Sequence, residues 1–364
     1  MGTDSIVYFR VDANQTIASG HMMRCKSIAT ALVEDGARVC FLLSDSESIP
    51  YLEQEDSSFP YQLLSTGSLT SPMEEVPEMA KVLLSGKKDC GSIPLLVVDS
   101  YFVTQNYFQA LKDHAKLVYL DDLRQFDPKV DLLINYDVIP ADRRAEYTDF
   151  YHNPGICLLG EQYTPLRPQF AASTVSSTET EESVRQDCTA LFFSTGGSDP
   201  LNFCEDFLAT VLPMFPTLTI HLLVGSFFTT GDILMELAKK YSTLVLHQNV
   251  TQMAALMKAC DLAFSAAGTT LYELCATGVA SYSFTLADNQ LPTATQLAEI
   301  DCIPYLGDIR SEKQQVLSQM VQILQEMAQE NSYEKRKTMH QKMHSHIDGL
   351  GAKRIARALL SLNK

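Results

Sequence analysis

The stretch that decides the fold is Ile6-Val7-Tyr8-Phe9-Arg10-Val11-Asp12, followed after a short loop by Ala18-Ser19-Gly20-His21-Met22-Met23-Arg24-Cys25. The first run predicts a buried strand. From Gly20 to about Asp35, apolar residues recur at spacings of three and four, which predicts a helix. Ligands of open α/β sheets bind at the carboxyl edge of the strands. His21 therefore occupies a position from which a neutral imidazole can act on a substrate.

The same alternation of short apolar runs and helical patterns continues along the whole chain. Continuous apolar strands are typical of a parallel sheet that is buried on both faces, and strand–helix alternation predicts a doubly wound domain. The sequence thus predicts an α/β protein with two Rossmann-like domains and a ligand cleft between them. The expected strands are Ile6–Arg10, Arg38–Leu43, Leu95–Asp99, Leu117–Asp121 and Leu132–Asn135, then Leu191–Ser194, Leu218–Val224, Leu244–Leu246, Leu262–Ser265 and Ala280–Phe284.

Residues 171–187 are small, polar and acidic, and they lack an apolar period, which indicates a linker or an exposed loop. We expect an N-terminal domain over residues 1–168, a linker over 169–187 and a C-terminal domain over 188–345. Residues 346–364 are expected to form a C-terminal helix.

Composition excludes several classes of function. The formal net charge of −16 over 364 residues argues against a nucleic-acid partner, which would need a basic face. The absence of any long apolar stretch and of a signal segment predicts a cytoplasmic protein with no membrane partner. Nine cysteines without a Cys-x-x-Cys pair indicate reduced thiols. We expect a monomer.

Cofactor and metal signals are weak. No Gly-x-Gly-x-x-Gly fingerprint and no P-loop occurs, so neither a dinucleotide cofactor nor ATP hydrolysis is expected. His340 and His344 lie one helical turn apart but lack an acidic or thiol partner at ligand spacing. The sequence therefore predicts no cofactor and no metal.

Three loops of the second half follow expected strands and have the character of ligand-binding loops. Thr195-Gly196-Gly197 allows the backbone to approach an anion, although a plain turn with an Asp cap remains open. Gly268-Thr269-Thr270 begins a helix whose positive end suits a diphosphate. Glu273, one turn later, is placed for a ribose or simply for the helix dipole. Asp288-Asn289-Gln290 suits a sugar or a helix cap.

The first half offers further candidates around His21. Either Asp12 or Asp99 is expected to orient the imidazole or the sugar. A helix N-terminus disfavours imidazolium, so we expect a neutral ring at pH 7. An ion-paired scaffold role stays open for the two arginines among the binding candidates of this half, which are Arg10, Asp12, Gly20 and Arg24.

Taken in order, these motifs resemble the UDP-sugar hydrolase family of pseudaminic acid biosynthesis, from about residue 5 to residue 300. That family cleaves UDP-2,4-diacetamido-2,4,6-trideoxy-β-L-altropyranose. The matching motifs are Phe9-Arg10-Val11-Asp12, Gly20-His21-Met22-Met23-Arg24-Cys25, Val97-Val98-Asp99-Ser100-Tyr101, Leu120-Asp121-Asp122, Leu158-Leu159-Gly160, Tyr163, Leu166-Arg167-Pro168, Thr195-Gly196-Gly197-Ser198-Asp199 and Ala287-Asp288-Asn289-Gln290.

The resemblance implies a fold similar to that of the peptidoglycan N-acetylglucosaminyltransferase, a GT-B glycosyltransferase architecture. It implies that His21 is catalytic, that Tyr101 faces the sugar, that Glu273 binds the ribose of UDP and that Asn289-Gln290 belongs to the site. Ala267 stands where many relatives have glycine; backbone contacts survive this change if its φ is negative.

The expected reaction is hydrolysis of the C1–O bond of a UDP-linked diacetamido sugar. Water attacks from the face opposite UDP, the configuration at C1 inverts, and His21 takes the proton of the water. Three alternatives remain open at this point: a glycosyltransferase of the same fold, a non-catalytic nucleotide-sugar binding protein, and a hydrolysing 2-epimerase.

Overall fold

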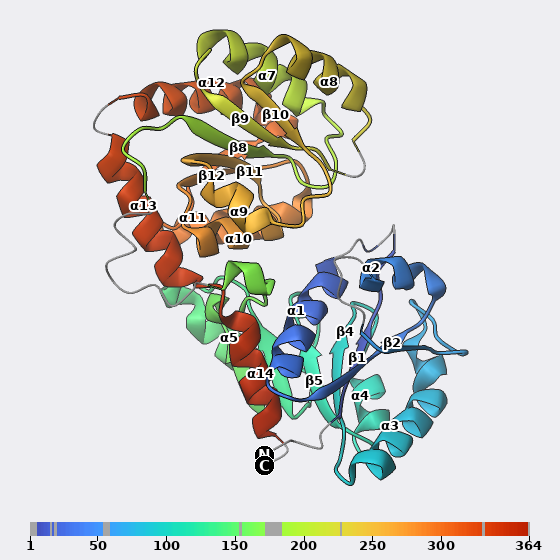
Figure 1. The fold of residues 1–364 in the computed structure, drawn as a ribbon. Coiled ribbons are helices and arrows are strands. Elements are labelled where there is room, and N and C mark those ends of the chain that lie inside the picture. The colour runs from blue at the N-terminus through green and yellow to red at the C-terminus, as the bar shows by residue number, and fades with distance from the viewer. Residues whose placement is uncertain are drawn as a thin grey trace. The chain divides into compact units, whose positions relative to one another are not determined.

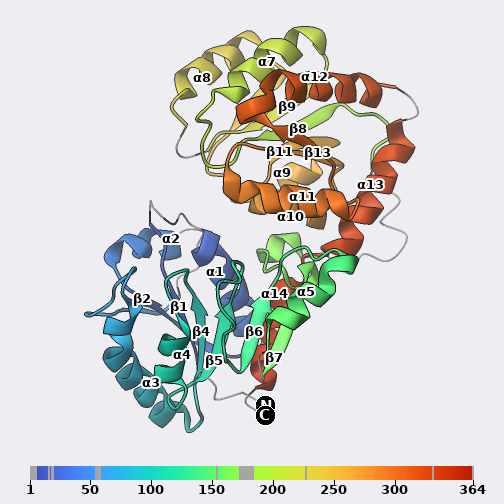
Figure 2. The same cartoon turned by 180° about the vertical axis from the view of Figure 1, so that it is seen from behind.

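The structure is a computed structural model in which the chain forms two compact units (Figures 1 and 2). Unit 1 is Met1–Pro168 together with Gly349–Lys364, and unit 2 is Gln169–Asp348. The residues described are 6–14, 17, 20–53, 59–152, 155–171, 184–225, 228–329 and 332–362.

Unit 1 is built on a seven-stranded parallel sheet with the order β3-β2-β1-β4-β5-β6-β7. The central strands are apolar and fully buried, as expected for a parallel sheet covered on both faces. The strands are β1 (Ile6–Val11), β2 (Arg38–Leu43), β3 (Tyr61–Leu63), β4 (Leu95–Asp99), β5 (Lys116–Leu120), β6 (Leu132–Asn135) and β7 (Ile156–Leu159).

Helices cover both faces of this sheet (Figure 1). Because side chains alternate along a strand, Tyr8 of β1 faces a core cluster to which α3 contributes Leu83 and α4 contributes Phe108. On α1, Cys25 and Leu32 are also fully buried. The helices are α1 (Gly20–Glu34), α2 (Ile49–Glu53), α3 (Val76–Cys90), α4 (Gln105–Leu111), α5 (Arg144–Phe150) and α14 (Gly351–Ser361).

Unit 2 repeats the doubly wound design with a six-stranded parallel sheet in the order β10-β9-β8-β11-β12-β13. One of its cores is aromatic: the rings of Phe193 and Phe207 stack with centroids 4.0 Å apart. The strands are β8 (Ala190–Ser194), β9 (Thr219–Leu223), β10 (Leu244–His247), β11 (Leu262–Ala266), β12 (Ser281–Thr285) and β13 (Tyr305–Asp308).

In unit 2, α7, α8 and α12 lie on one face of the sheet, and α9, α10 and α11 lie on the other (Figures 1 and 2). The first face buries the larger cluster, in which Phe207, Leu234 and Met320 meet the strands. The helices are α7 (Phe203–Met214), α8 (Gly231–Lys240), α9 (Met253–Lys258), α10 (Thr269–Thr277), α11 (Leu291–Glu299), α12 (Ile309–Met327) and α13 (Ser332–His346).

The predicted fold class is confirmed for each unit, and every strand expected from the sequence is present to within a residue or two. Three strands escaped prediction. β3 and β7 are short edge strands with exposed side chains, and β13 contains Gly307, a residue that weakens a strand pattern. β3 and β13 therefore lack a continuous apolar run, whereas β7 is apolar throughout but only four residues long.

The expected C-terminal helix is present as α14, which is shorter than residues 346–364. α13 ends at His346, and Gly349 then adopts a φ of 75° that an L side chain rarely tolerates. α14 packs in unit 1, where Arg354 Nη1 donates to the Gln162 carbonyl at 2.9 Å. Gly351 has no room for a side chain, because an added Cβ would lie 2.1 Å from the Thr164 oxygen.

The expected linker is only partly described, since residues 172–183 lie outside the described ranges. Its start is not a free loop. Gln169 donates to the Thr251 carbonyl at 2.9 Å and accepts from the Ala254 amide at 3.0 Å. These bonds anchor residue 169 to unit 2.

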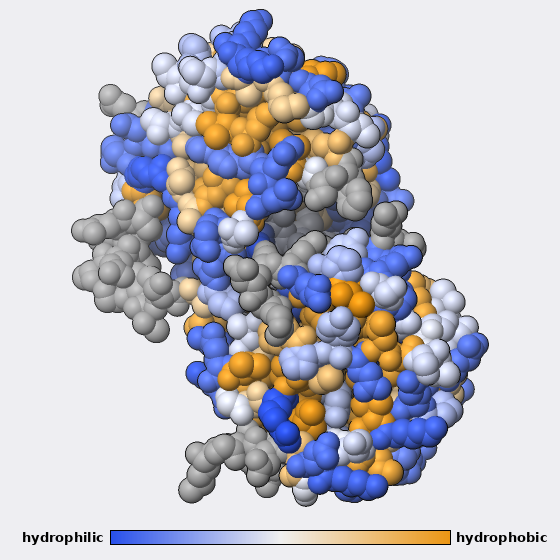
Figure 3. Space-filling model, turned by 45° about the vertical axis from the view of Figure 1, so that its right-hand side comes forward, coloured by the Kyte–Doolittle hydropathy of each residue, from blue (hydrophilic) through white to orange (hydrophobic). Residues whose placement is uncertain are grey.

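Among the described helices, none is long and apolar enough to cross a bilayer. On the face drawn in Figure 3, polar and apolar side chains lie side by side in both units.

A buried ion triad supports the first strand. Arg10 is 2% exposed, its Nε and Nη2 donate to the Glu75 carboxylate at 2.6 and 2.9 Å, and its Nη1 donates to Asp12 at 2.5 Å. Burial alone would lower the pKa of Arg10, but Asp12 and Glu75 outweigh it and raise the pKa above its ordinary value. Arg10 therefore carries a buried charge that depends on these two carboxylate partners.

Replacing Glu75 by Gln should destabilise unit 1 by about 3–5 kcal/mol, because it leaves the Arg10 charge buried and undercompensated. Urea unfolding followed by far-UV circular dichroism measures the loss. Glu74→Gln, at the exposed neighbouring position, is the matched control and should stay within about 0.5 kcal/mol of the wild type. Equal midpoints for both variants would contradict the importance of the triad.

Candidate active site

The strand order of unit 1 creates a topological switch point at the carboxyl ends of β1 and β4. From β1 the chain turns to β2 on one side, while β4 pairs with β1 on the other. Such a switch point is where open α/β sheets bind ligands. His21, the second residue of α1, and Tyr101, two residues after β4, both lie at this edge.

His21 is held by a carboxylate at the end of β4. Its Nδ1 lies 2.5 Å from Asp99 Oδ1, and the Tyr101 ring meets the imidazole edge-on with centroids 4.4 Å apart. Of the two carboxylates that the sequence left as candidates, Asp99 makes this contact. If Nδ1 carries the proton and donates it to Asp99, Nε2 keeps a lone pair. A histidine held this way is able to accept a proton from water.

Arg24 ties the same carboxylate to the neighbouring strand ends. Its Nε and Nη2 each donate to Asp99 at 2.5 Å. Its Nη1 donates to Asp122 at 2.8 Å and to the Tyr136 hydroxyl. Nη2 also lies 3.0 Å from His21 Nδ1. Arg24 is buried and engaged through every nitrogen, so the structure gives it the scaffold role that the sequence left open.

The charge on Asp99 follows from these contacts. Burial alone would raise the pKa of Asp99, but Arg24 and His21 outweigh it and hold the pKa well below its usual range. Asp99 therefore carries a full negative charge. That charge stabilises an imidazolium formed on His21, and the neighbouring Arg24 charge opposes it.

Arg10 and Asp12 take different parts. Asp12 lines the pocket beside His21 and accepts the Ser44 amide at 2.7 Å. Arg10 belongs to the buried triad below it and has no place on the pocket surface. The expectation that Arg10 binds substrate is therefore corrected. Its guanidinium is paired with Glu75 and Asp12 inside the protein, and it holds the Asp12 carboxylate in place.

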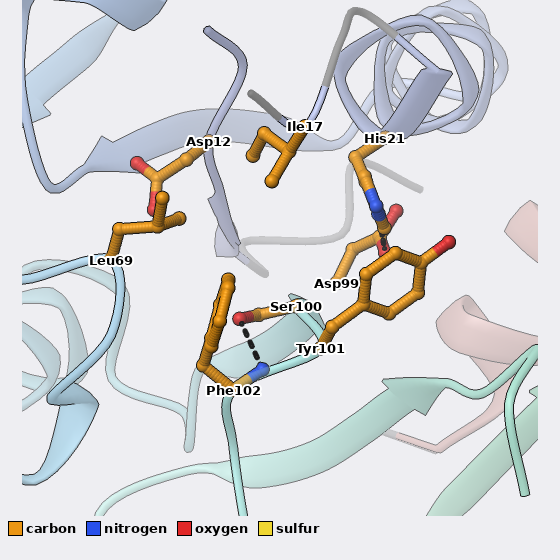
Figure 4. A pocket seen from close by; sticks show the side chains of 8 residues that line it. All are labelled: Asp12, Ile17, His21, Leu69, Asp99, Ser100, Tyr101 and Phe102. Carbon is orange, nitrogen blue, oxygen red and sulfur yellow. Dashed lines mark hydrogen bonds and ion pairs between the residues drawn. The ribbon is translucent and has the colours of Figure 1, made fainter.

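A small pocket that is partly open to solvent is lined by His21 and Asp99 (Figure 4). The His21 and Tyr101 rings stand together on one side of it, with Asp99 behind the imidazole. Gly20, at the start of α1, is exposed, and an added Cβ would meet no described atom within 4 Å. The lining residues are Asp12, Ile17, His21, Leu69, Asp99, Ser100, Tyr101 and Phe102.

Two carboxylates next to this pocket were assigned no role from the sequence. Asp122 follows β5 and accepts from Arg24 and from the Tyr101 hydroxyl, the latter at 3.2 Å. Asp137 follows β6 and accepts from the Tyr147 hydroxyl at 3.2 Å. Burial, and next the charge of Asp122, raise the pKa of Asp137 to about 6. The Leu120-Asp121-Asp122 motif was the available signal, but strand-end acids are too common to single it out.

Unit 2 has its own switch point, at the carboxyl ends of β8 and β11, which pair up to Ser194 and Ser265. The loop after β8 begins with buried Thr195 and then Gly196, whose φ of 89° favours glycine. Asp199 accepts the Phe203 and Cys204 amides at 2.9 Å and so caps α7. The Asp-capped turn left open by the sequence is thus present.

The space around this loop is also limited at Gly197. An added Cβ on Gly225, in the loop after β9, would lie 2.3 Å from the Gly197 carbonyl oxygen. The two loops therefore pack backbone against backbone, and the first of them is held firmly at the switch point.

The loop after β11 is different, because among the described residues no side chain caps α10. Gly268 is its N-cap and is exposed, and an added Cβ there would meet no described atom within 4 Å. Thr269 and Thr270 begin the helix, and Glu273 lies half-buried one turn later. Ala267 is absent from the described non-glycine residues with positive φ. This positive helix end is suited to an anion.

The third loop lies beside it, after β12. Asp288, Asn289 and Gln290 form a short 3₁₀ turn. Asp288 pairs with Arg310 at 2.6 Å, and Gln290 Oε1 accepts the Leu286 amide at 2.9 Å. Asn289 is exposed. Two of the three side chains thus shape their own loop.

Within the described ranges, no group of three or more His, Cys, Asp or Glu side chains is placed to hold a metal ion. His340 and His344 have their Nδ1 atoms next to the Gly278 and Ala276 carbonyls, at 2.8 and 3.2 Å. No disulfide joins any of the nine cysteines, all of which lie in the described ranges.

No protein-family model matches the chain. It is 23% identical over 275 residues to an uncharacterised protein of Methanocaldococcus jannaschii, covering 74% of this chain and 53% of that protein. It is 26% identical to a spore coat polysaccharide biosynthesis protein of Bacillus subtilis, covering 56% and 58%. It is also 26% identical to the pseudaminic acid cytidylyltransferase and UDP-2,4-diacetamido-2,4,6-trideoxy-beta-L-altropyranose hydrolase of Helicobacter pylori, covering 55% and 35%. The matches thus span from about a third to just over half of these relatives.

Solved structures with the same fold cover nearly the whole chain. MurG of Acinetobacter baumannii aligns with a TM-score of 0.66 at 14% identity, covering 98% of this chain and 99% of that one. UDP-GlcNAc 2-epimerase of Neisseria meningitidis, bound to UDP-GlcNAc, gives 0.62 at 12%, and Arabidopsis thaliana UGT89C1 complexed with UDP gives 0.61 at 13%; both alignments cover 98% and 99%. The chain therefore has the two Rossmann-like units of the GT-B fold.

Replacing Asp137 by Asn should stabilise unit 1 at pH 7.5 by about 1–3 kcal/mol and have little effect at pH 4. The pKa of about 6 in the folded state lies above the ordinary 3.8, so stability is lost as pH rises through 6. A neutral amide avoids that loss. Urea unfolding at the two pH values measures the difference. Asp142→Asn, at an exposed position nearby, should change stability little at either pH. A D137N variant no more stable than the wild type at pH 7.5 would contradict the analysis.

Proposed function

We propose that this protein is an enzyme of nucleotide-sugar metabolism that hydrolyses the C1–O bond of a UDP-linked diacetamido sugar. The products are UDP and the free sugar, and the sugar is the 2,4-diacetamido-2,4,6-trideoxy hexose used for pseudaminic acid. The observation that carries the proposal is the buried pairing of His21 with Asp99 at the switch point of unit 1.

The mechanism begins with a water molecule beside His21. Nε2 takes one proton of the water as its oxygen forms a bond to C1, and Asp99 stabilises the imidazolium through Nδ1. The C1–O bond to the nucleotide breaks, and its electron pair leaves with the β-phosphate oxygen of UDP. Because water enters opposite the leaving group, the configuration at C1 inverts.

Unit 2 supplies the proposed nucleotide site. The exposed N-terminus of α10 at Gly268 has a positive end that stabilises charge developing on the diphosphate. Glu273, one turn into the helix, is the proposed partner of the ribose hydroxyls. UDP is a good leaving group, so the reaction needs no dedicated acid.

The comparisons support this choice among sugar-nucleotide reactions. The name of the H. pylori relative includes hydrolysis of the same UDP-diacetamido sugar, and the B. subtilis relative is named for polysaccharide biosynthesis. Fold neighbours were crystallised with UDP and with UDP-GlcNAc. A base poised for water favours the hydrolase activity over the cytidylyltransferase activity in the name of the H. pylori protein.

The direct test is incubation of the purified protein with a panel of UDP-sugars, without an acceptor. Phosphorus NMR should report UDP, and proton NMR should report the inverted anomer first. Formation of UMP and a sugar phosphate as products would contradict C1–O cleavage. Release of UDP only when an acceptor is present would indicate a transferase. Deuterium incorporated at C2 would indicate a 2-epimerase.

Replacing His21 by Asn should lower kcat by about 10²–10⁴-fold with a small change in KM, because the variant loses the base but keeps the sugar and nucleotide contacts. Steady-state kinetics with the diacetamido substrate measure both constants. His152→Asn is the control, since its side chain is 75% exposed. An H21N variant as active as the wild type would refute the assigned role.

Replacing Gly268 by Asp should weaken UDP binding at least tenfold while leaving stability equal or slightly higher. Asp is a better N-cap than Gly by a few tenths of a kcal/mol, but its charge repels a diphosphate. Gly268→Ser is the matched control, because serine also caps a helix and carries no charge. Calorimetric titration with UDP measures affinity, and equal values for the two variants would argue against this helix end as the diphosphate site.

A further inference from the structure

We propose that Asp122 determines sugar specificity in unit 1: its Oδ1 atom accepts the N–H of one acetamido group of the substrate. This inference rests on the proposed function, since it assigns a partner to part of the sugar. It adds a residue whose chemistry neither the reaction step nor the nucleotide site uses.

The geometry places Asp122 behind the pocket lining, in contact with Tyr101, which is a lining residue. It follows β5 by two residues, and β5 pairs with β4, which ends at Asp99. Its Oδ2 accepts from Arg24 Nη1 at 2.8 Å and from the Tyr101 hydroxyl at 3.2 Å. Because Tyr101 also contacts the His21 ring, Asp122 is one side chain away from the proposed base.

The other carboxylate oxygen has no such partner. Asp122 Oδ1 is buried, and no hydrogen-bond donor within the described ranges reaches it. The side chain as a whole is 21% exposed while Oδ1 itself is shielded, so the proposed contact requires the carboxylate to turn toward the sugar when it binds. Buried polar atoms in native proteins are nearly always satisfied, and an exception calls for a functional explanation.

The surroundings determine what kind of group fits there. Every nitrogen of Arg24 already donates to a protein oxygen, and the Tyr101 hydroxyl donates to Asp122. What remains is two acceptors, Asp122 Oδ1 and the lone pairs of the Tyr101 oxygen. A site that offers only hydrogen-bond acceptors rejects phosphate and carboxylate groups, which are acceptors themselves, and selects hydrogen-bond donors. The nitrogen of an amide is a donor only, and the proposed sugar carries two such groups.

Asp122→Asn separates this role from a structural one. The amide oxygen must face Arg24 and Tyr101 to keep their bonds, so the NH₂ group takes the place of Oδ1. The substitution therefore retains the protein contacts and changes an acceptor into a donor at the proposed contact. Asp137→Asn, two residues after the next strand and bonded to Tyr147, is the matched control.

The experiment is calorimetric binding of the UDP-diacetamido sugar in the His21→Asn background, where turnover is not needed. Two analogues are compared with it, each with one acetamido N–H replaced by N–CH₃. We expect the parent protein to bind one analogue at least tenfold more weakly than the natural sugar. Adding D122N should weaken binding of the natural sugar at least tenfold and abolish the difference in affinity between the natural sugar and that analogue. Adding D137N should change neither the affinity nor this difference.

Two results would overturn the inference. In the first, the D122N variant binds all three ligands with the same affinity as its parent; in the second, it binds all three more weakly by one common factor. The second result would mark a structural role. If the sugar binds but wild-type protein never releases UDP, the hydrolase proposal fails while the Asp122 assignment is still decided by binding. If no UDP-sugar binds, both are rejected.

Discussion

The bidentate ion pair between Arg24 and Asp99 is the interaction on which the candidate site depends. It buries one positive and one negative charge at the end of β4, and each is tolerable only beside the other. The pair fixes Asp99 as an anion and so orients the His21 ring. Through its remaining nitrogen, Arg24 also connects the ends of β5 and β6 to the same point. One side chain of α1 thus aligns three strand ends.

The two units solve different electrostatic problems with the same fold. Unit 1 gathers carboxylates, tyrosines and one histidine around a buried arginine, a setting suited to proton transfer and to sugar donors. Unit 2 offers an uncapped helix end at its switch point. The chain carries a net charge of −16, so attraction of the proposed anionic nucleotide has to be local. Helix ends and backbone amides provide such local attraction without basic side chains.

Much of the fold could be predicted because its strands and helices follow from local patterns of apolar residues. Val7, Val97 and Phe264 belong to apolar runs that are recognisable from the sequence. Tyr61 of β3 is not, because an exposed edge strand needs no apolar period. The site was only partly predictable. His21 stood out by its position after Gly20, whereas Arg10 was expected to bind substrate and instead lies in a buried triad with Glu75, 65 residues away in sequence.

The sequence by itself determined the class of fold, the carboxyl-edge position of His21 and the glycine-containing loops of unit 2, because each depends on residues within one strand–turn–helix segment. Only the tertiary structure decided that Asp99 rather than Asp12 holds His21, that Asp199 caps its own helix, and that Asp122 keeps an unused oxygen. Those outcomes depend on which strands become neighbours. Strand order is set by long-range packing and leaves no local trace in the chain.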